Sequence, residues 1–271
     1  MESTVTTTDS HLAGTGNHNL SRTGAGMSPS IRTTFEGMNE ATMQADLTDE
    51  PTRAKTGTPT WKRCFDFSLI LLSAPFWLPV CLVIALVIRL GSRGPILFKQ
   101  ERIGQGGRVF ICYKFRTMRL NAPQSAHQEH VKDLIESSTP MIKLDAENDG
   151  RLIRGGSWIR ASGLDELAQL TNIVRGEMSF VGPRPCIPYE YAMYQPWQRR
   201  RCAAPPGLTG LWQVSGKNHT TFSQMVHLDI QYARKMSVWL DISILVRTPL
   251  VIVQQVLEMR AAKRARYKSA E

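Results

Sequence analysis

Two adjacent carboxylates, Asp165 and Glu166, are candidates for catalysis because of their residue types and their spacing. Neighbouring residues on a helix point about 100° apart, so one carboxylate can meet a substrate atom while the other holds a cation. Four basic residues accompany the pair in the sequence: Arg160, Arg184, Lys114 and Arg116. Carboxylates beside several guanidinium groups suit phosphoryl transfer, in which Mg²⁺ and arginine neutralise charge while a nucleophile attacks in line.

A structural interpretation of the same carboxylates is also open. Residues 162–165 fit a capping box, in which Ser162 caps a helix and the Asp165 carboxylate returns to it. Acidic residues at a helix start also complement the helix dipole. Apolar side chains then recur at helical spacing, which predicts an amphipathic helix from about Leu164 with Gly176 as its stop.

The basic residues belong to two stretches that must hold them in place. Residues 95–118 have the pattern of two strands around a glycine-rich turn, with Lys114 and Arg116 at the end of the second strand. No Gly-Lys-Ser/Thr follows the glycines, so the turn is not a P-loop. Prolines on both sides of Arg184 predict a stiff turn that would fix its guanidinium group.

One segment, Phe67 to Ile88, runs for 22 residues without a charge and is long enough to span a bilayer. Pro75 and Pro79 lie in its middle, where proline breaks or kinks a helix. Basic residues flank both ends of the segment: Lys62, Arg63, Arg89 and Arg93. Since such residues prefer the cytoplasmic side, the pattern predicts a proline-broken re-entrant hairpin. A kinked spanning helix and a buried helix of a soluble protein are the alternatives.

The net charge of +10 points to an anionic partner: nucleic acid, a membrane surface or a phosphorylated substrate. Residues 1–60 carry four basic and seven acidic side chains, so the basic excess belongs to residues 61–271. The first segment has 14 threonines and few large apolar side chains, and we expect a disordered arm there. Residues 260–271 form a basic tail that is either solvated or attracted to anionic lipid.

Other features argue against metal-binding and disulfide-rich classes. The five cysteines are odd in number and widely spaced, which favours a reducing compartment and disfavours a disulfide framework or a zinc site. His127 and His130 stand alone in a polar stretch that we expect to be a solvated loop. Residues 238–257 are strongly apolar and predict a helix in the core or at a membrane interface.

Six motifs in one order carry a resemblance to a known family: Lys62-Arg-Cys-Phe-Asp66, Gln100-Glu-Arg-Ile-Gly104, Tyr113-Lys-Phe-Arg-Thr-Met118, Leu164-Asp-Glu-Leu167, Gly176-Glu-Met-Ser-Phe-Val-Gly-Pro-Arg-Pro185 and Pro206-Gly-Leu-Thr-Gly-Leu-Trp-Gln-Val-Ser-Gly216. From Lys62 to about Leu257 the chain resembles the bacterial monotopic phosphoglycosyl transferases. These sugar transferases load a sugar phosphate onto undecaprenyl phosphate. The last motif is most similar to short exopolysaccharide-priming members that use a UDP-hexose.

The resemblance implies a mixed α+β, mainly helical fold. Between the disordered arm at 1–60 and the basic tail at 260–271, which composition predicts, its parts would be a re-entrant membrane hairpin at 61–92 and a small catalytic domain at 93–259. The catalytic domain would contain a β-hairpin and interfacial amphipathic helices. It would lie on the cytoplasmic face of the bacterial inner membrane.

The resemblance also implies a mechanism. Asp165 would attack the β-phosphate of a UDP-sugar, expel UMP and carry the sugar phosphate until undecaprenyl phosphate takes it. Glu166 would hold Mg²⁺. The implied phosphate-binding residues are Arg160, Arg184, Lys114, Arg116 and Lys217.

The chain departs from the family pattern at several positions. Leu78 precedes Pro79 where the family often has serine, so Ser73 is the candidate to bind the freed backbone. Gly163 replaces a serine before the Leu-Asp-Glu string. Lys217 stands where arginine is usual, which keeps the charge but loses the bidentate fork.

Two other function classes remain to be weighed. A catalytically silent relative could act as a membrane-bound assembly partner. A nucleic-acid-binding protein is disfavoured, because no helix-turn-helix, zinc-finger or RNP-like motif accompanies the charge. The sequence leaves open whether the sugar is glucose or galactose, and a homodimer is one of the oligomeric states that it allows.

Overall fold

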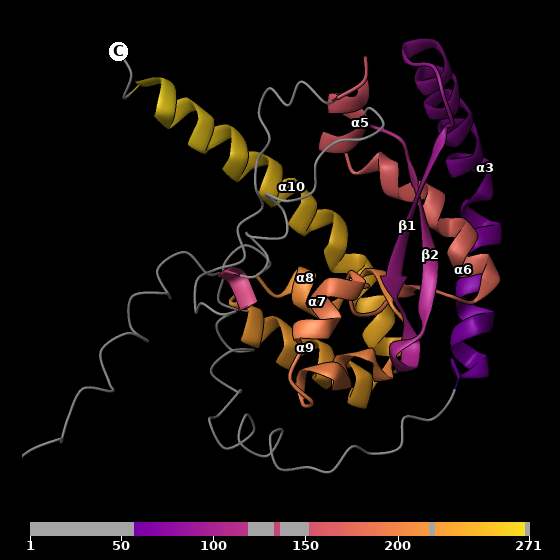
Figure 1. The fold of residues 1–271 in the computed structure, drawn as a ribbon, viewed down its shortest axis with the longest axis vertical. Coiled ribbons are helices and arrows are strands. Elements are labelled where there is room, and N and C mark those ends of the chain that lie inside the picture. The colour runs from indigo at the N-terminus through magenta and orange to yellow at the C-terminus, as the bar shows by residue number, and fades with distance from the viewer. Residues whose placement is uncertain (1–56, 119–132, 136–151, 217–219, 269–271) are drawn as a thin grey trace, which may run out of the picture. The chain divides into compact units, whose positions relative to one another are not determined.

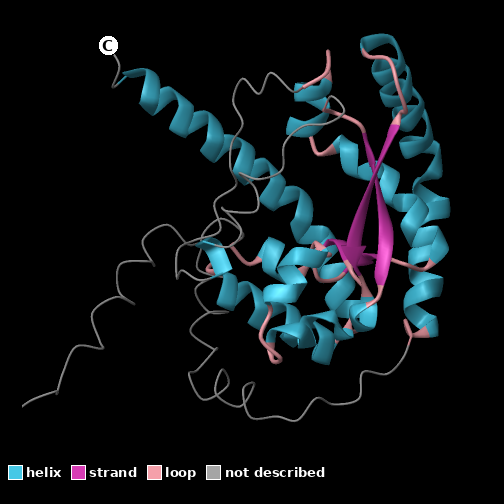
Figure 2. Cartoon of the chain, viewed as in Figure 1, coloured by secondary structure: helices cyan, strands magenta, loops and turns pink. Residues whose placement is uncertain are grey.

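The structure, a computed structural model, describes residues 57–118, 133–135, 152–216 and 220–268. The described chain is a mixed α/β fold, mostly helical, with two small two-stranded sheets (Figure 2). This confirms the predicted fold class in its coarse form. In chain order the elements are α3 (Thr60–Gly91), β1 (Leu97–Ile103), η1 (Gln105–Gly107), β2 (Val109–Phe115), α5 (Gly156–Ala161), η2 (Leu164–Gln169), α6 (Leu170–Arg175), β3 (Ser179–Val181), α7 (Pro188–Met193), η3 (Gln198–Ala203), β4 (Gly207–Thr209), α8 (Leu211–Val214), α9 (Phe222–Lys235) and α10 (Val238–Lys268).

The predicted β-hairpin is confirmed. β1 and β2 pair antiparallel, and Leu97 lies opposite Phe115 at the open end. At the closed end Gly106 and Gly107 adopt φ values of 68° and 78°. Residues with a Cβ rarely adopt such angles, so these two glycines allow the chain to reverse tightly.

The apolar segment forms α3, one continuous helix that contains Pro75 and Pro79, where the sequence predicted a break. Each proline removes one backbone donor, and Pro75 leaves the carbonyl of Leu71 without its usual partner. The hydroxyl of Ser73 donates to the carbonyl of Leu69, one turn before it. Ser73 therefore serves a different carbonyl from the one that Pro75 frees.

The outer surface of α3 is apolar and exposed. Its exposed large side chains are Phe67, Leu71, Leu72, Phe76, Leu78, Val80, Leu82, Val83, Leu86 and Leu90. By length and composition the helix could cross a membrane, and 11% of its most apolar 18-residue stretch is buried. A core helix of a soluble protein would be mostly buried, so that alternative does not fit. How the segment enters and leaves a membrane stays a prediction.

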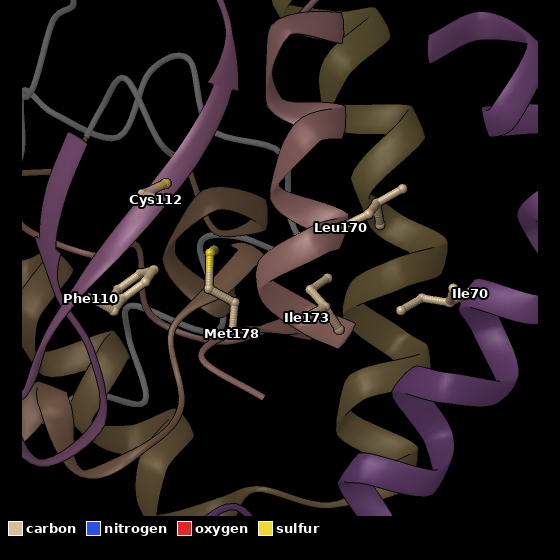
Figure 3. Packing of buried hydrophobic residues seen from close by; sticks show 6 residues of the cluster. All are labelled: Ile70, Phe110, Cys112, Leu170, Ile173 and Met178. Atoms are coloured by element: carbon tan, nitrogen blue, oxygen red, sulfur yellow. The ribbon is translucent and has the colours of Figure 1, made fainter. Parts of the chain in front are cut away.

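The inner side of α3 packs on two apolar clusters, beside α6 and the hairpin (Figure 1). In the first cluster Ile70 points toward Leu170 and Ile173 of α6, and Met178 lies between Ile173 and Phe110 of β2 (Figure 3). The second cluster lies along the later half of α3: Ile84, Ile88, Phe115, Ile153, Ile159 and Ala168. Each fully buried Ile or Leu contributes about 1.5–3 kcal/mol, so both halves of α3 are firmly attached.

A buried polar network, which the sequence analysis did not anticipate, holds the start of α3. Lys62 is fully buried, forms an ion pair with Asp241 of α10 and donates to the hydroxyl of Tyr232 at 2.9 Å. The Tyr232 hydroxyl is 2.7 Å from Asp241 Oδ1. One turn later, Asp66 Oδ1 accepts from the hydroxyl of Ser179 at 2.9 Å. The network joins α3 to α9, α10 and β3.

The carboxylate pair does not start a regular helix as predicted. It lies in η2, a 3₁₀ segment, which leads directly into α6. The Ser162 hydroxyl donates backward to two carbonyls of α5, and Gly163, at φ 72°, separates it from η2. The capping-box interpretation is therefore wrong, because Ser162 completes the preceding helix. Gly176 ends α6 at φ 81°, as predicted.

α10 covers the predicted apolar stretch at 238–257 and continues to Lys268. Asp241 and Ile244 are buried, whereas Trp239 is 80% exposed, so the helix is partly core and partly surface. The predicted boundary of the basic tail at residue 260 falls inside this helix. Of the predicted arm at 1–60, the structure describes residues 57–60, and Thr60 begins α3.

Candidate active site

A pocket lies between the hairpin, η2 and the segments around β4. Its lining residues are Arg102, Cys112, Lys114, Glu166, Gln169, Arg184, Pro185, Gly207, Leu208 and Gln213. Three residues predicted from the sequence, Lys114, Glu166 and Arg184, meet here although 70 positions separate the first from the last. Asp165 stands next to Glu166 and is half-buried.

Opposite charges surround the carboxylate pair. Lys114 Nζ lies 3.0 Å from Glu166 Oε1, and both side chains keep some solvent exposure. Burial raises the pKa of Asp165 above its usual value, the positive charges of Lys114 and Arg160 oppose the rise, and the neighbouring Glu166 adds to it. Asp165 is thus a carboxylate that is more basic than usual and remains close to cations.

Asn172 sets the distance between the carboxylate pair and the hairpin. Its buried Oδ1 accepts the backbone N–H of Tyr113 at 3.0 Å, and its Nδ2 donates to the carbonyl of Ile111 at 2.6 Å. The side chain therefore pairs with β2 as a further strand would. Because Asn172 lies on α6, directly after η2, these bonds hold both carboxylates beside Lys114.

A close backbone approach positions Arg184. A Cβ added to Gly207 would lie 2.1 Å from the backbone nitrogen of Gly182, so glycine is required there. Arg201 Nη2 donates to the Arg184 carbonyl at 3.1 Å, and Arg201 is held by Asp229 at 2.6 Å. Within the described residues the Arg184 guanidinium has no hydrogen-bonding partner, which leaves it available for an anion.

Arg102 is a pocket residue that the sequence analysis missed. It is 8% exposed, donates through Nη1 to the Pro185 carbonyl at 2.8 Å and through Nη2 to Gln100 Oε1 at 2.8 Å. Burial lowers its pKa, and the nearby Arg184 charge lowers it further. Strand alternation could have identified it, because the predicted hairpin places Arg102 and Lys114 on one face.

Arg116, predicted to bind phosphate, lies in a different place. It is buried, and its guanidinium donates to the backbone carbonyls of Arg93 at 2.9 Å and Ser92 at 3.1 Å. These carbonyls follow the end of α3 directly. Arg116 therefore fixes the exit of α3, because it follows the last residue of β2 and no longer continues the alternation that aims Lys114 at the pocket.

The other predicted residues have mixed placements. Arg160 is exposed and donates to the thioether of Met118, so its link to Asp165 is through charge and not through direct contact with the pocket. Lys217, His127 and His130 lie outside the described residues.

A magnesium site was predicted at Glu166. Among the described residues, no three His, Cys, Asp or Glu side chains come together as a metal site. Mg²⁺ does not need such a cluster, because one or two carboxylates commonly hold it together with water and substrate phosphates. Glu166 in the pocket wall, with Asp165 beside it in the sequence, supplies the kind of oxygen donors that Mg²⁺ accepts.

Comparison with known proteins gives consistent matches. The sequence model of the family described as bacterial sugar transferase matches residues 57–255. Galactosyl transferase CpsE of Streptococcus agalactiae is 43% identical over 59% of this chain and 35% of its own length. Undecaprenyl-phosphate galactose phosphotransferase of Salmonella typhimurium is 38% identical, and the match covers 60% of this chain and 34% of that protein. Exopolysaccharide production protein ExoY of Rhizobium meliloti is 36% identical, and the match covers 69% of this chain and 83% of that protein. The chain thus matches about a third of the first two relatives and most of the third.

Proposed function

This chain belongs to the bacterial sugar transferase family, and from that premise we propose that it transfers a hexose 1-phosphate from a UDP-sugar to undecaprenyl phosphate. The observation that carries the proposal is the meeting of Lys114, Glu166, Arg102 and Arg184 in one pocket beside Asp165. Fixed cations around a carboxylate suit phosphoryl transfer. The Salmonella relative, named as an undecaprenyl-phosphate galactose phosphotransferase, supports the acceptor.

In the first step Asp165 is the nucleophile. A carboxylate oxygen attacks the phosphorus that carries the sugar, the bond from that phosphorus to the bridging oxygen breaks, and UMP leaves with the electron pair. The product is an acyl phosphate that joins Asp165 to the sugar phosphate. The raised pKa of Asp165 supports this role, because a more basic carboxylate is a better nucleophile once it is ionised.

The basic residues would stabilise the charge that moves during this step. Arg184 and Arg102 line the pocket where phosphate oxygens would lie, and guanidinium groups bind such oxygens in pairs. Arg102 is already fixed by Gln100 and the Pro185 carbonyl. Donors that are fixed before the reaction need no reorganisation in the transition state, which lowers the barrier.

Glu166 and Gln213 would orient the donor. Glu166 would hold Mg²⁺, which when bound neutralises phosphate charge. Lys114, whose Nζ lies 3.0 Å from Glu166 Oε1, holds the Glu166 carboxylate in place at the pocket. Within the described chain Gln213 Oε1 is buried without a hydrogen-bonding partner, so this amide can accept a hydrogen bond from a sugar hydroxyl.

In the second step the undecaprenyl phosphate oxygen attacks the same phosphorus and releases Asp165. The exposed apolar surface of α3 supports a place in the bacterial inner membrane, with the pocket on the cytoplasmic face, where the lipid phosphate can reach it. In this proposal the product primes exopolysaccharide synthesis, a role supported by the name of the Rhizobium relative.

The covalent step can be tested directly. Protein reconstituted in lipid nanodiscs is incubated with Mg²⁺ and UDP-glucose or UDP-galactose, without acceptor, and UMP and the mass of the Asp165 peptide are measured. We expect one UMP per protein and a sugar-phosphate adduct with the preferred donor. Asp165→Asn should give neither, and full activity in that variant would refute the nucleophile. A silent assembly partner would yield neither signal from any donor.

The re-entrant topology needs its own test. Single cysteines at Thr60 and Gly91, in a variant without native cysteines, are labelled in sealed vesicles by a reagent that does not cross the membrane. We expect both ends to react from the same face. Reaction from opposite faces would show that α3 spans the membrane.

A further inference from the structure

A second pocket adjoins the first, and the two share Arg184 and Pro185. Its lining residues are Leu134, Ile135, Arg184, Pro185, Cys186, Glu190, Tyr194, Arg201, Phe222 and Met225. We propose that this pocket holds the uracil base of the UDP-sugar and that Glu190 selects uracil over cytosine. The inference rests on the function proposed above and identifies where the leaving nucleotide binds.

The lining of the second pocket is mostly apolar, and most of its polar groups are already engaged. Arg201 is bound to Asp229 and to the hydroxyl of Tyr194, the latter at 2.9 Å. Glu190 Oε2 accepts the backbone N–H of Ile187 at 3.1 Å, which leaves its other oxygen as an acceptor. Few polar groups therefore remain for a ligand.

This balance fits a base better than a hexose. A hexose carries a hydroxyl on most of its carbons, and each buried hydroxyl needs a partner. Uracil presents two apolar faces and a few polar edge atoms, which suit the apolar side chains of Phe222, Met225 and Tyr194. The rings of Tyr194 and Phe222 lie 5.5 Å apart and give the pocket a rigid aromatic wall.

The positions of the two pockets agree with an in-line reaction. Leu208, in the first pocket, packs against the cluster that contains Ile70 of α3, so this pocket adjoins the core beneath α3 and η2. The second pocket is formed by α7, η3 and α9, beyond Arg184. Because the leaving group departs opposite the attacking oxygen, UMP should lie on the far side of the phosphorus from Asp165. Arg184, between the pockets, can then bind the phosphate that joins the ribose.

Glu190 supplies the specificity in this proposal. Uracil has an N–H donor at N3, whereas neutral cytosine has an unprotonated nitrogen acceptor there. The free Glu190 oxygen can accept from the uracil N3–H and would repel the cytosine N3 lone pair. A site that rejects a ligand by an unpaired buried polar group discriminates strongly.

Binding of UMP and CMP to the full-length protein in nanodiscs tests this assignment, with inorganic phosphate as a probe of the first pocket alone. We expect the wild type to bind UMP at least tenfold more tightly than CMP. Glu190→Gln keeps the capping oxygen for Ile187 and replaces the free oxygen with an amide N–H. This variant should lose about tenfold in UMP affinity and gain in CMP affinity.

Two controls separate the base pocket from the phosphate site. Removing the Glu190 charge, which acts on Arg102, should leave phosphate binding unchanged or stronger. Glu101 is an exposed carboxylate on β1, and Glu101→Gln should change the affinity for neither UMP nor CMP. Phe222→Leu should weaken UMP and CMP alike without affecting phosphate, and a thermal unfolding curve checks that it still folds.

The outcomes distinguish this inference from the proposed function. Unchanged UMP and CMP affinities in Glu190→Gln and Phe222→Leu, in a protein that still releases UMP, would refute the base pocket alone. An altered preference between UDP-glucose and UDP-galactose at constant UMP affinity would place the hexose there instead. A wild type that binds UMP no better than phosphate and releases none from any donor would refute the function itself.

Discussion

Two groups of charged residues in this molecule are built in opposite ways. The anchor network, Lys62 with Asp66, Tyr232 and Asp241, gives each charged group a polar partner within it or on the adjoining strand. The pocket cluster, Lys114, Glu166, Arg102 and Arg184, has three cations for one carboxylate. The difference teaches that the charges of the first group are met mainly by other protein groups, with Asp66 Oδ2 left buried without a partner among the described residues, whereas the second has an excess of positive charge that an anionic substrate would balance.

The largest expected effect comes from breaking the anchor network. Lys62→Met should reduce the free energy of unfolding by about 3–5 kcal/mol, because it leaves the Asp241 carboxylate buried without its cation. Thermal unfolding followed by tryptophan fluorescence measures the loss. The double variant Lys62→Met/Asp241→Asn removes both charges and should lose less. Equal stability in the wild type and Lys62→Met would contradict the structural role.

Removing a cation from the pocket cluster should instead affect the reaction. Arg184→Ala should slow UMP release roughly 10²–10³-fold and leave the unfolding temperature nearly unchanged, because its guanidinium binds no other described group. Arg108→Ala, at the exposed hairpin turn, and Lys268→Ala are the matched controls. If all three variants lost activity equally, the pocket would not be the reaction site.

A variant of Arg116 tests whether a buried arginine with backbone partners serves stability, in contrast to Arg184, which lines the pocket. Arg116→Gln should cost about 1.5–3 kcal/mol in the free energy of unfolding, since it removes charged hydrogen bonds to the carbonyls of Ser92 and Arg93. The KM for the UDP-sugar in the folded protein should stay near the wild-type value. A raised KM at unchanged stability would return Arg116 to the phosphate-binding residues.

The smallest effect concerns pH. Burial raises the pKa of Asp165 above 3.8, so single-turnover UMP release should fall as the pH drops through this raised value and the proposed nucleophile is protonated. Glu166→Gln removes a negative neighbour and should move this fall to lower pH. Lys114→Met should move it to higher pH, and Lys99→Met, an exposed lysine of β1, should not move it. Identical profiles would show that another group controls the rate.

The hairpin shows how far local sequence signals reach. Its glycine turn was predictable because positive φ angles depend on the residue itself, and the same holds for Gly176 at the end of α6. The motifs predicted Arg116 as a phosphate-binding residue and did not point to Arg102, which lines the pocket. Which side chain points to the pocket depends on the register of two strands and on where the second strand ends.

The start of η2 shows where a local sequence pattern is not sufficient. Ser162 satisfies the sequence pattern of a cap, but its hydroxyl binds carbonyls of α5. Short polar side chains can bind the backbone on either side, so the pattern does not give the direction. In α3, too, the local pattern was not sufficient. The two prolines predicted a break, but the helix packs on two apolar clusters and continues through Pro75 and Pro79 despite the lost backbone bonds.

The sequence alone determined the chemical repertoire: the carboxylate pair, the cations around it, an apolar segment long enough for a membrane, and the glycines that reverse the chain. These depend on residue type and local spacing. Tertiary structure decided which cations share the pocket, that Lys62 and Asp66 anchor α3, and that a second, mostly apolar pocket adjoins Arg184. These features depend on contacts between residues far apart in the chain, and only packing sets such distances.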